Sequence, residues 1–309
     1  LNMLGIAMEL AVDNKVYESL AIKFGEHFFY IAGSMANVGN IEGEGLWDEE
    51  DEFYYDVLRF PNGTWDRMRL RTIVGLIPLL AVTVIDEGNW QKLPRLDVHL
   101  KWFLTQRPDL ALLVSNWSAT GQSDKHLLSL LRGHRMKAIL SRMLDEDEFL
   151  SLHGIRSVSK FYQEHPFNYG LYGHNYTVTY TPAESDTGMF GGNSNWRGPI
   201  WMPINYLLIE ALKQFHEYYT DDFKVEYPTR SGNFFSLNEI ADSLSKRLNT
   251  LFIKDENGRR AVMGDNNKLQ TDPYFKDNIL FHEYFNGDNG KGLGASHQTG
   301  WTGLISVLE

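Results

Sequence analysis

Residues 1–36 have the sequence LNMLGIAMELAVDNKVYESLAIKFGEHFFYIAGSMA. Apolar residues recur at helical spacing on both sides of a break at Asp13-Asn14. The stretch therefore predicts two helices, over 1–12 and 15–36, joined by a turn of two to three residues. A helical hairpin at this point favours an all-α chain.

Helical periodicity returns several times downstream. We expect further helices over 69–86, 88–105, 124–142, 199–219 and 236–252, and a last helix that begins near Thr299. Long loops rich in Gly, Asn and aromatic residues separate them, over 37–51, 151–198 and 283–298. Apart from a short strand-like run over 53–58, no strong strand series is evident, so sandwiches and parallel sheets are disfavoured. Helix pairs with long loops on one face indicate a toroid of helices.

Composition narrows the classes of function. The chain has 309 residues, a net charge of −11 and no cysteine. The negative charge argues against nucleic acid and anionic membranes as partners. The missing cysteines exclude disulfides and thiolate metal sites, and with no visible signal peptide they fit a cytoplasmic protein. Aromatic residues make up 13% of the chain, many of them in loops, where stacking on sugars would explain them.

Motifs for bound ions or nucleotides are missing from the sequence. The 10 His residues show no HExxH pattern, and no Gly-rich phosphate loop is present. The run over 286–290 has the composition of a calcium loop but lacks the EF-hand spacing. We therefore expect neither a metal nor a cofactor.

Three segments could carry chemistry. The first, over 47–56, holds five consecutive acids between aromatic residues and could hold a cation or a polyol, although acid runs are more often solvated turns. The second, over 193–206, places two prolines at the opening of a helix, with Trp and Arg side chains near the mouth of a cleft. Its tryptophans could equally be packing residues.

The third segment, over 282–303, contains Glu283 between His282 and Tyr284 at the start of a Gly-rich loop. A carboxylate in this setting could act as a general base, and the glycines would let the backbone approach a ligand closely. The alternative is a surface acid at the end of an element.

Taken together, in their order along the chain, the three segments resemble glycoside hydrolase family 63. The matching stretches are Asp48 to Asp56, Gly154 to Ser157, Trp196 to Trp201 with Asn205, and Glu283 to Phe285 before the loop that ends at Gly300-Trp301-Thr302. The resemblance runs over nearly the whole chain. It identifies 1–309 as the C-terminal portion of an (α/α)6 catalytic domain of a bacterial or archaeal type.

The resemblance implies a toroid like that of trehalases and glucoamylases, and inverting hydrolysis of an α-glycosidic bond. Glu283 falls at the position of the general base, and the substrate would be an oligosaccharide, an α-glucoside or a glucosyl- or mannosyl-glycerate. We expect eight further residues to contact the sugar: Trp196, Arg197, Trp201, Asn205, Tyr55, His297, Gln298 and Trp301.

The general acid is where the sequence departs from the family. The family's acid is an Asp upstream of the helix that here begins at Leu1, and the chain shows about eight helices where a toroid needs twelve. We therefore expect a truncated chain that is inactive alone. A non-catalytic sugar-binding or interaction module remains an alternative, as does a helical lyase or epimerase with His282, His297 or Tyr284 as its base. The sugar specificity and the oligomeric state stay open.

Overall fold

A computed structural model describes residues 1–37, 45–114, 124–131, 133–186 and 198–308. The chain divides into two compact units. Unit 1 comprises Leu1–Arg69, Val74–Ile139 and Lys213–Phe223. Unit 2 comprises Leu70–Ile73, Leu140–Leu212 and Lys224–Glu309.

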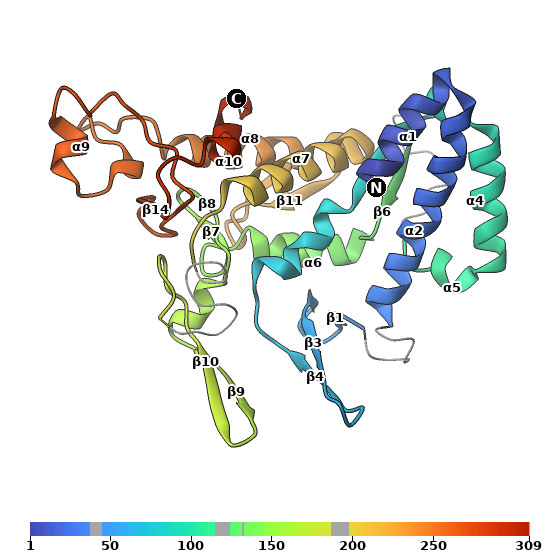
Figure 1. Cartoon of the computed structure of the whole chain (residues 1–309), viewed down its shortest axis with the longest axis horizontal. Helices are drawn as coiled ribbons and strands as arrows, with labels where there is room; N and C mark the ends of the chain where they lie inside the picture. The colour runs from blue at the N-terminus through green and yellow to red at the C-terminus, as the bar shows by residue number, and fades with distance from the viewer. Residues whose placement is uncertain (38–44, 115–123, 132, 187–197, 309) are drawn as a thin grey trace. The chain divides into compact units, whose positions relative to one another are not determined.

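The helices of unit 1 begin with the predicted hairpin. They are α1 (Asn2–Asp13), α2 (Glu18–Ala36), α3 (Glu87–Trp90), α4 (Pro94–Gln106) and α5 (Pro108–Ala111), with parts of α6 (Gly133–Met143) and α7 (Met202–Tyr219). The side chain of Asn14 accepts a hydrogen bond from the backbone N–H of Val16, which stabilises the turn between α1 and α2. α2 packs against α1, α4 and α5 (Figure 1). The prediction for residues 1–36 is confirmed.

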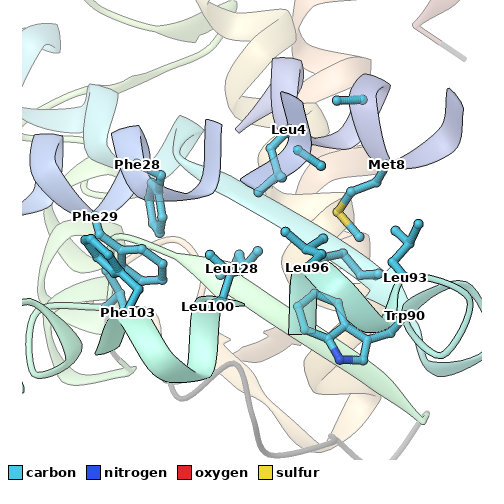
Figure 2. Packing of buried hydrophobic residues seen from close by; sticks show 14 of the residues in the cluster. Leu4, Met8, Phe28, Phe29, Trp90, Leu93, Leu96, Leu100, Phe103 and Leu128 are labelled. Carbon is cyan, nitrogen blue, oxygen red and sulfur yellow. The ribbon is translucent and has the colours of Figure 1, made fainter. Parts of the chain in front are cut away.

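The apolar faces of these helices form the core of unit 1 (Figure 2). Leu4 of α1, Phe29 of α2 and Leu100 of α4 are each fully buried. The rings of Phe29 and Phe103 stack with their centroids 5.9 Å apart. Burial of each such side chain contributes roughly 1.5–3 kcal/mol, so this face is the main source of stability for α1, α2 and α4.

The described strands of unit 1 form three antiparallel pairs. They are β1 (Trp47–Asp48) with β2 (Phe53–Tyr54), β3 (Asp56–Arg59) with β4 (Trp65–Met68), and β5 (Val82–Asp86) with β6 (Lys125–Ser129). The helix expected over 69–86 is therefore wrong. Pro78 cannot donate a backbone hydrogen bond, and it lies within a 3₁₀ helix, Ile73–Leu80. The β-branched residues that follow pair with 125–129, so the helix expected over 124–142 shortens to α6.

Unit 2 contains α8 (Leu237–Asn249), α9 (Asn267–Thr271) and α10 (Thr299–Thr302), with the remaining parts of α6 and α7. Its described strands pair as β7 (Leu150–Ser151) with β8 (Gly154–Ile155), β9 (Phe167–Leu171) with β10 (His174–Val178), β11 (Lys224–Glu226) with β12 (Phe234–Ser236), and β13 (Tyr284–Phe285) with β14 (Gly292–Leu293). Ser236 and Glu239 form a reciprocal capping box at the start of α8, which fixes where that helix begins. The helices expected over 199–219, over 236–252 and near Thr299 are confirmed.

The fold class is helical, as expected, with more strand than expected. In the part of the chain that the structure describes, every sheet has two strands, so the strands form local hairpins and ties rather than a layer of the fold. The twelve-helix toroid remains a prediction. No helix among the described residues is both long and apolar enough to cross a membrane.

Candidate functional site

Glu283 lies directly before β13, where the loop after β14 runs back beside it. Its backbone N–H donates to the carbonyl of Ala295 over 2.8 Å. The backbone N–H of Ala295 in turn donates to Oε2 of Glu283 over 3.2 Å. One carboxylate oxygen is thus oriented by the backbone, while the side chain as a whole is only half-buried.

A glycine makes this approach possible. Gly294 has a φ of +65°, a region that side-chain-bearing residues seldom adopt. A Cβ at this position would lie 2.6 Å from Oε2 of Glu283 and 2.6 Å from Cε1 of Tyr284. Any larger residue would therefore displace the carboxylate or the ring.

Helix α10 holds the backbone on both sides of Glu283. The indole N–H of Trp301 donates to the carbonyl of Glu283 over 3.0 Å. The hydroxyl of Thr302 donates to the carbonyl of His282 over 2.6 Å, and Thr302 is fully buried. These two bonds fix the peptide units that flank Glu283, so the direction of its side chain is set by α10 as well as by β14.

An aromatic group stands beside the carboxylate. The rings of Trp201 and Tyr284 lie 4.7 Å apart at 31°, and Trp201 and Trp301 meet edge to face at 5.7 Å. Tyr284 donates its hydroxyl proton to Oε1 of Glu184 over 2.8 Å. The buried indole N–H of Trp201 has no hydrogen-bond partner among the described residues. The structure thus brings three of the predicted residues, Trp201, Glu283 and Trp301, into one cluster.

Ile200 joins the sequence segments that the resemblance singled out. It forms antiparallel bridges with Arg156 on one side and Phe285 on the other. Its N–H donates to the carbonyl of Phe285 over 2.8 Å and its carbonyl accepts from the N–H of Phe285 over 2.9 Å. The 154–157, 198–201 and 283–285 segments are therefore three neighbouring backbones of one arrangement.

The side-chain amide of Asn205 holds two of these backbone segments together. Its Oδ1 accepts from the N–H of Ile155 over 2.7 Å. Its Nδ2 donates to the carbonyls of Ile155 over 3.1 Å and Trp201 over 3.0 Å. Asn205 is buried, with 1% of its surface exposed. Both ends of the amide are thus engaged by backbone, which makes Asn205 a support for the loop rather than a side chain directed at a ligand.

A buried guanidinium ties the turn after β13 to the rest of unit 2. Arg156 is 5% exposed, and its Nε donates to the hydroxyl of Tyr180 over 3.0 Å. That hydroxyl donates to Oδ1 of Asp288 over 2.7 Å. Burial raises the pKa of Tyr180 well above its usual range, so the phenol stays protonated and remains a donor. The run over 286–290 is thus anchored as a turn.

His282 is the titratable neighbour of Glu283. Burial lowers the pKa of its imidazole, and the nearby His297 lowers it further, while a backbone hydrogen bond at Leu293 acts in the opposite direction. Its Nδ1 is buried without a hydrogen-bond partner among the described residues. The imidazole of His282 is therefore neutral at pH 7.

His297 and Gln298 lie on the same loop. His297 forms a parallel bridge with Phe281, and the N–H of Gln298 donates to the carbonyl of Phe281 over 2.8 Å. The carbonyl of Gln298 accepts from the N–H groups of Trp301 and Thr302, each over 2.9 Å. Both residues thus flank the Glu283 cluster through their backbones. Two further predicted residues, Trp196 and Arg197, lie outside the described residues.

The acidic segment belongs to unit 1, and it is not a uniformly solvated turn. Asp48 is 1% exposed, and its carboxylate accepts from Arg67 over 2.9 Å and from Arg69 over 3.1 Å. Burial alone would raise the pKa of Asp48, but the N–H of Asp51 and the two guanidiniums outweigh it and hold the pKa below its ordinary value. Tyr55 is also buried and donates its hydroxyl proton to Oδ2 of Asp51 over 2.8 Å. Both side chains are thus held by contacts within unit 1, and a sugar contact by Tyr55 remains a prediction.

The sequence did not single out Gly294 and Thr302 as individual site residues. Gly294 was one of several glycines in the loop, and only its positive φ and short contacts distinguish it. Thr302 was part of a matched motif without a role of its own. Among the residues that the structure describes, no group of three or more His, Asp or Glu is placed to hold a metal ion.

Comparison with known proteins points to one enzyme class. A family model described as the mannosylglycerate hydrolase MGH1-like glycoside hydrolase domain matches residues 126–302. A Saccharomyces cerevisiae protein described as uncharacterized is 47% identical over 319 residues, covering 99% of this chain and 29% of that protein. The mannosyl-oligosaccharide glucosidase of the same yeast is 28% identical over 117 residues, covering 38% of this chain and 11% of the enzyme.

A probable mannosyl-oligosaccharide glucosidase of Schizosaccharomyces pombe is 25% identical over 173 residues, covering 55% of this chain and 15% of that protein. The chain thus spans less than a third of the length of the curated relatives that it matches. The glucosidases support the relationship to glycoside hydrolase family 63 that the sequence motifs indicate.

Proposed function

Because the chain belongs to the mannosylglycerate hydrolase MGH1-like glycoside hydrolase family, we propose that its full-length protein hydrolyses an α-glycosidic bond with Glu283 as general base. The observation that carries the proposal is the setting of this carboxylate. One of its oxygens accepts a backbone hydrogen bond, the peptide units on both sides of the residue are held by α10, and aromatic rings stand beside it.

In this mechanism, the ionised Glu283 accepts a proton from a water molecule, and the resulting nucleophile attacks the anomeric carbon. A protonated carboxyl on the other face of the sugar gives its proton to the leaving oxygen. Inverting enzymes place the two carboxyls about 6.5–9.5 Å apart, which leaves room for that water. We propose that the general acid is not among residues 1–309, so this chain alone has little or no turnover.

The rest of the cluster would bind and orient the sugar. Trp201 and Trp301 offer ring surfaces to the apolar C–H face of a pyranose. Arg197 directly precedes the Gly198-Pro199 step that leads into this cluster. The other proposed sugar contacts are Trp196, Arg197, His297, Gln298 and Tyr55. Asn205 acts through the position of Ile155 rather than by direct contact.

The substrate that we propose is an α-glucoside or a glucosyl- or mannosyl-glycerate. Two findings support this class: the family description names mannosylglycerate hydrolase, and two relatives are mannosyl-oligosaccharide glucosidases, one of them probable. No cofactor enters the proposed reaction.

The test is product analysis by proton NMR with the full-length protein. The substrates are α-linked gluco- and manno-disaccharides and the two glycerate glycosides. The proposal requires a free reducing sugar that appears first as the β-anomer, because inversion at an α-linked carbon yields β. Appearance of the α-anomer would contradict inversion, and an unsaturated product would indicate elimination by a lyase instead of hydrolysis.

A further inference from the structure

A second carboxylate, that of Glu184, contacts the Glu283 cluster. Its Oε1 accepts the hydroxyl proton of Tyr284 over 2.8 Å. Glu184 is exposed, whereas only 6% of Tyr284 is exposed. The hydrogen bond therefore joins a carboxylate at the surface to a phenol whose ring lies inside unit 2.

The chain just before Glu184 is held by two backbone hydrogen bonds of 2.7 Å each. They run from the N–H of Gly198 to the carbonyl of Thr181, and from the N–H of Gly287 to the carbonyl of Pro182. Gly287 belongs to the turn between β13 and β14. The backbone that carries the acceptor is therefore tied to the site itself.

The ring of Tyr284 adjoins both proposed functional groups. On one side, a Cβ on Gly294 would lie 2.6 Å from Cε1 of Tyr284 and 2.6 Å from Oε2 of Glu283, so the ring and the carboxylate flank the same glycine. On the other side, the ring packs on Trp201, with the centroids 4.7 Å apart at 31°. A rotation of the Tyr284 ring would therefore disturb the proposed base, the proposed sugar platform or both.

The Tyr284 side chain is anchored at both of its ends. Its backbone pairs with Leu293 in the β13–β14 hairpin, and its hydroxyl donates to Glu184. A hydroxyl that donates to a carboxylate makes a charge-assisted hydrogen bond, which is roughly twice as strong as a neutral one. Loss of this bond would loosen the phenol end of the ring.

We propose that Glu184 is a positioning residue, which holds the Tyr284 ring in the orientation that places the Glu283 carboxylate and the Trp201 ring. This inference rests on the proposed function and adds to it a residue that acts through another side chain. The role requires a hydrogen-bond acceptor at position 184 but no negative charge. A glutamine there would therefore serve, whereas an alanine would not.

The kinetic test compares variants of the full-length protein on the best α-glycoside substrate. We expect Glu184→Ala to lower kcat/KM roughly three- to tenfold, which corresponds to one hydrogen bond, and Glu184→Gln to restore most of that loss. Tyr284→Phe should lower kcat/KM as much as Glu184→Ala. The double variant should be no worse than either single variant, because both changes delete the same bond. Glu256→Ala, at an exposed acid of the same unit, is the matched control and should keep full kcat/KM.

A second measurement reports on the ring without turnover. The protein is labelled with 5-fluorotryptophan, and the fluorine NMR signal of Trp201 is identified by its absence in Trp201→Phe. Because Trp201 packs on Tyr284, we expect this signal to shift in the same direction in Glu184→Ala and Tyr284→Phe, and to shift less in Glu184→Gln. The melting temperature of Glu184→Ala should change little, since Glu184 is exposed. A role in stability alone would therefore leave kcat/KM and the Trp201 signal unchanged.

Three kinetic outcomes overturn the inference. The first is an equal kcat/KM in Glu184→Ala and Glu256→Ala, and the second is a loss in Glu184→Gln as large as that in Glu184→Ala. The third is a loss of more than about a hundredfold in Tyr284→Phe, which would make Tyr284 itself a catalytic group.

Failure of the catalytic proposal gives a different result, because the unaltered protein would then show no turnover on any α-glycoside. In that case the fluorine signal of Trp201 decides whether Glu184 holds the ring. A shift in Glu184→Ala that Glu184→Gln reverses would support the positioning of the ring. An unchanged signal in Glu184→Ala would overturn it.

Discussion

Gly294→Ala perturbs the Glu283 cluster with a single methyl group. The new Cβ would lie 2.6 Å from both Oε2 of Glu283 and Cε1 of Tyr284. The Tyr284 ring is 6% exposed and packs on Trp201, so it cannot move easily. The half-buried Glu283 side chain is the group that must shift.

The expected loss of stability has two parts. A left-handed backbone costs a residue with a Cβ about 1–2 kcal/mol. Overpacking against the ring and the carboxylate adds roughly 1–3 kcal/mol. We therefore expect the free energy of unfolding to fall by about 2–5 kcal/mol in urea denaturation. In the full-length protein, turnover should fall roughly a hundredfold, because the carboxylate is displaced by about 1 Å.

Alanine variants at two other glycines of unit 2 separate the backbone cost from the overpacking cost. Gly258 has a φ of +74° but open space where a Cβ would stand, so Gly258→Ala measures the backbone cost alone. Gly300 has open space and no positive φ, so Gly300→Ala should be neutral or stabilising by about 0.5–1 kcal/mol. If Gly294→Ala costs no more than Gly258→Ala, the proposed contact between Gly294 and the Glu283 carboxylate is wrong.

Two further predictions concern the same unit. Burial lowers the pKa of His282 in the folded state, so below about pH 6.5 the unfolded chain takes up a proton at this residue before the folded chain does. We therefore expect the melting temperature to fall as the pH drops through this range. In His282→Gln the melting temperature should fall less steeply with pH. We also expect Asn205→Ala to lower the free energy of unfolding in urea by about 2–4 kcal/mol, because it leaves buried backbone groups of Ile155 unpaired.

Each of these two predictions has a control variant at an exposed residue of the same type. His174→Gln should leave the dependence of stability on pH unchanged. The pH dependence that remains in His282→Gln is expected to come from His153, because burial also lowers the pKa of that residue. An unchanged pH dependence in His282→Gln would refute the assignment of that histidine. Asn257→Ala should cost little, and a similar cost for Asn205→Ala would show that its hydrogen bonds contribute little to stability.

Local pattern was enough to predict most helices and the short strand-like run over 53–58, where β2 and β3 lie, but not the other strands. The hairpin of 1–36 and the helices α7 and α8 follow from apolar spacing that tertiary packing reinforces. The helix expected over 69–86 failed because the β-branched residues of β5 pair with β6, about forty residues away. Such a pairing cannot be read from periodicity within one window.

The sequence predicted the proposed reactive and sugar-contacting residues of the site better than the residues that hold them in place. The sequence pointed to Glu283, Trp201 and Trp301, and the structure brings them together. Asn205 was expected to contact a sugar because its motif adjoins the tryptophans. Whether an amide meets backbone or ligand depends on the partner that the fold supplies, here Ile155, and that information is not local.

The most direct test of the central claim is the turnover of Glu283→Gln in the full-length protein on the best α-glycoside substrate. We expect kcat to fall by at least about 10²–10⁴-fold while sugar binding is retained, because the amide cannot take a proton from water. Glu256→Gln, an exposed acid in a turn of the same unit, should keep full turnover. Near-normal turnover in Glu283→Gln would contradict the assignment of Glu283 as the general base.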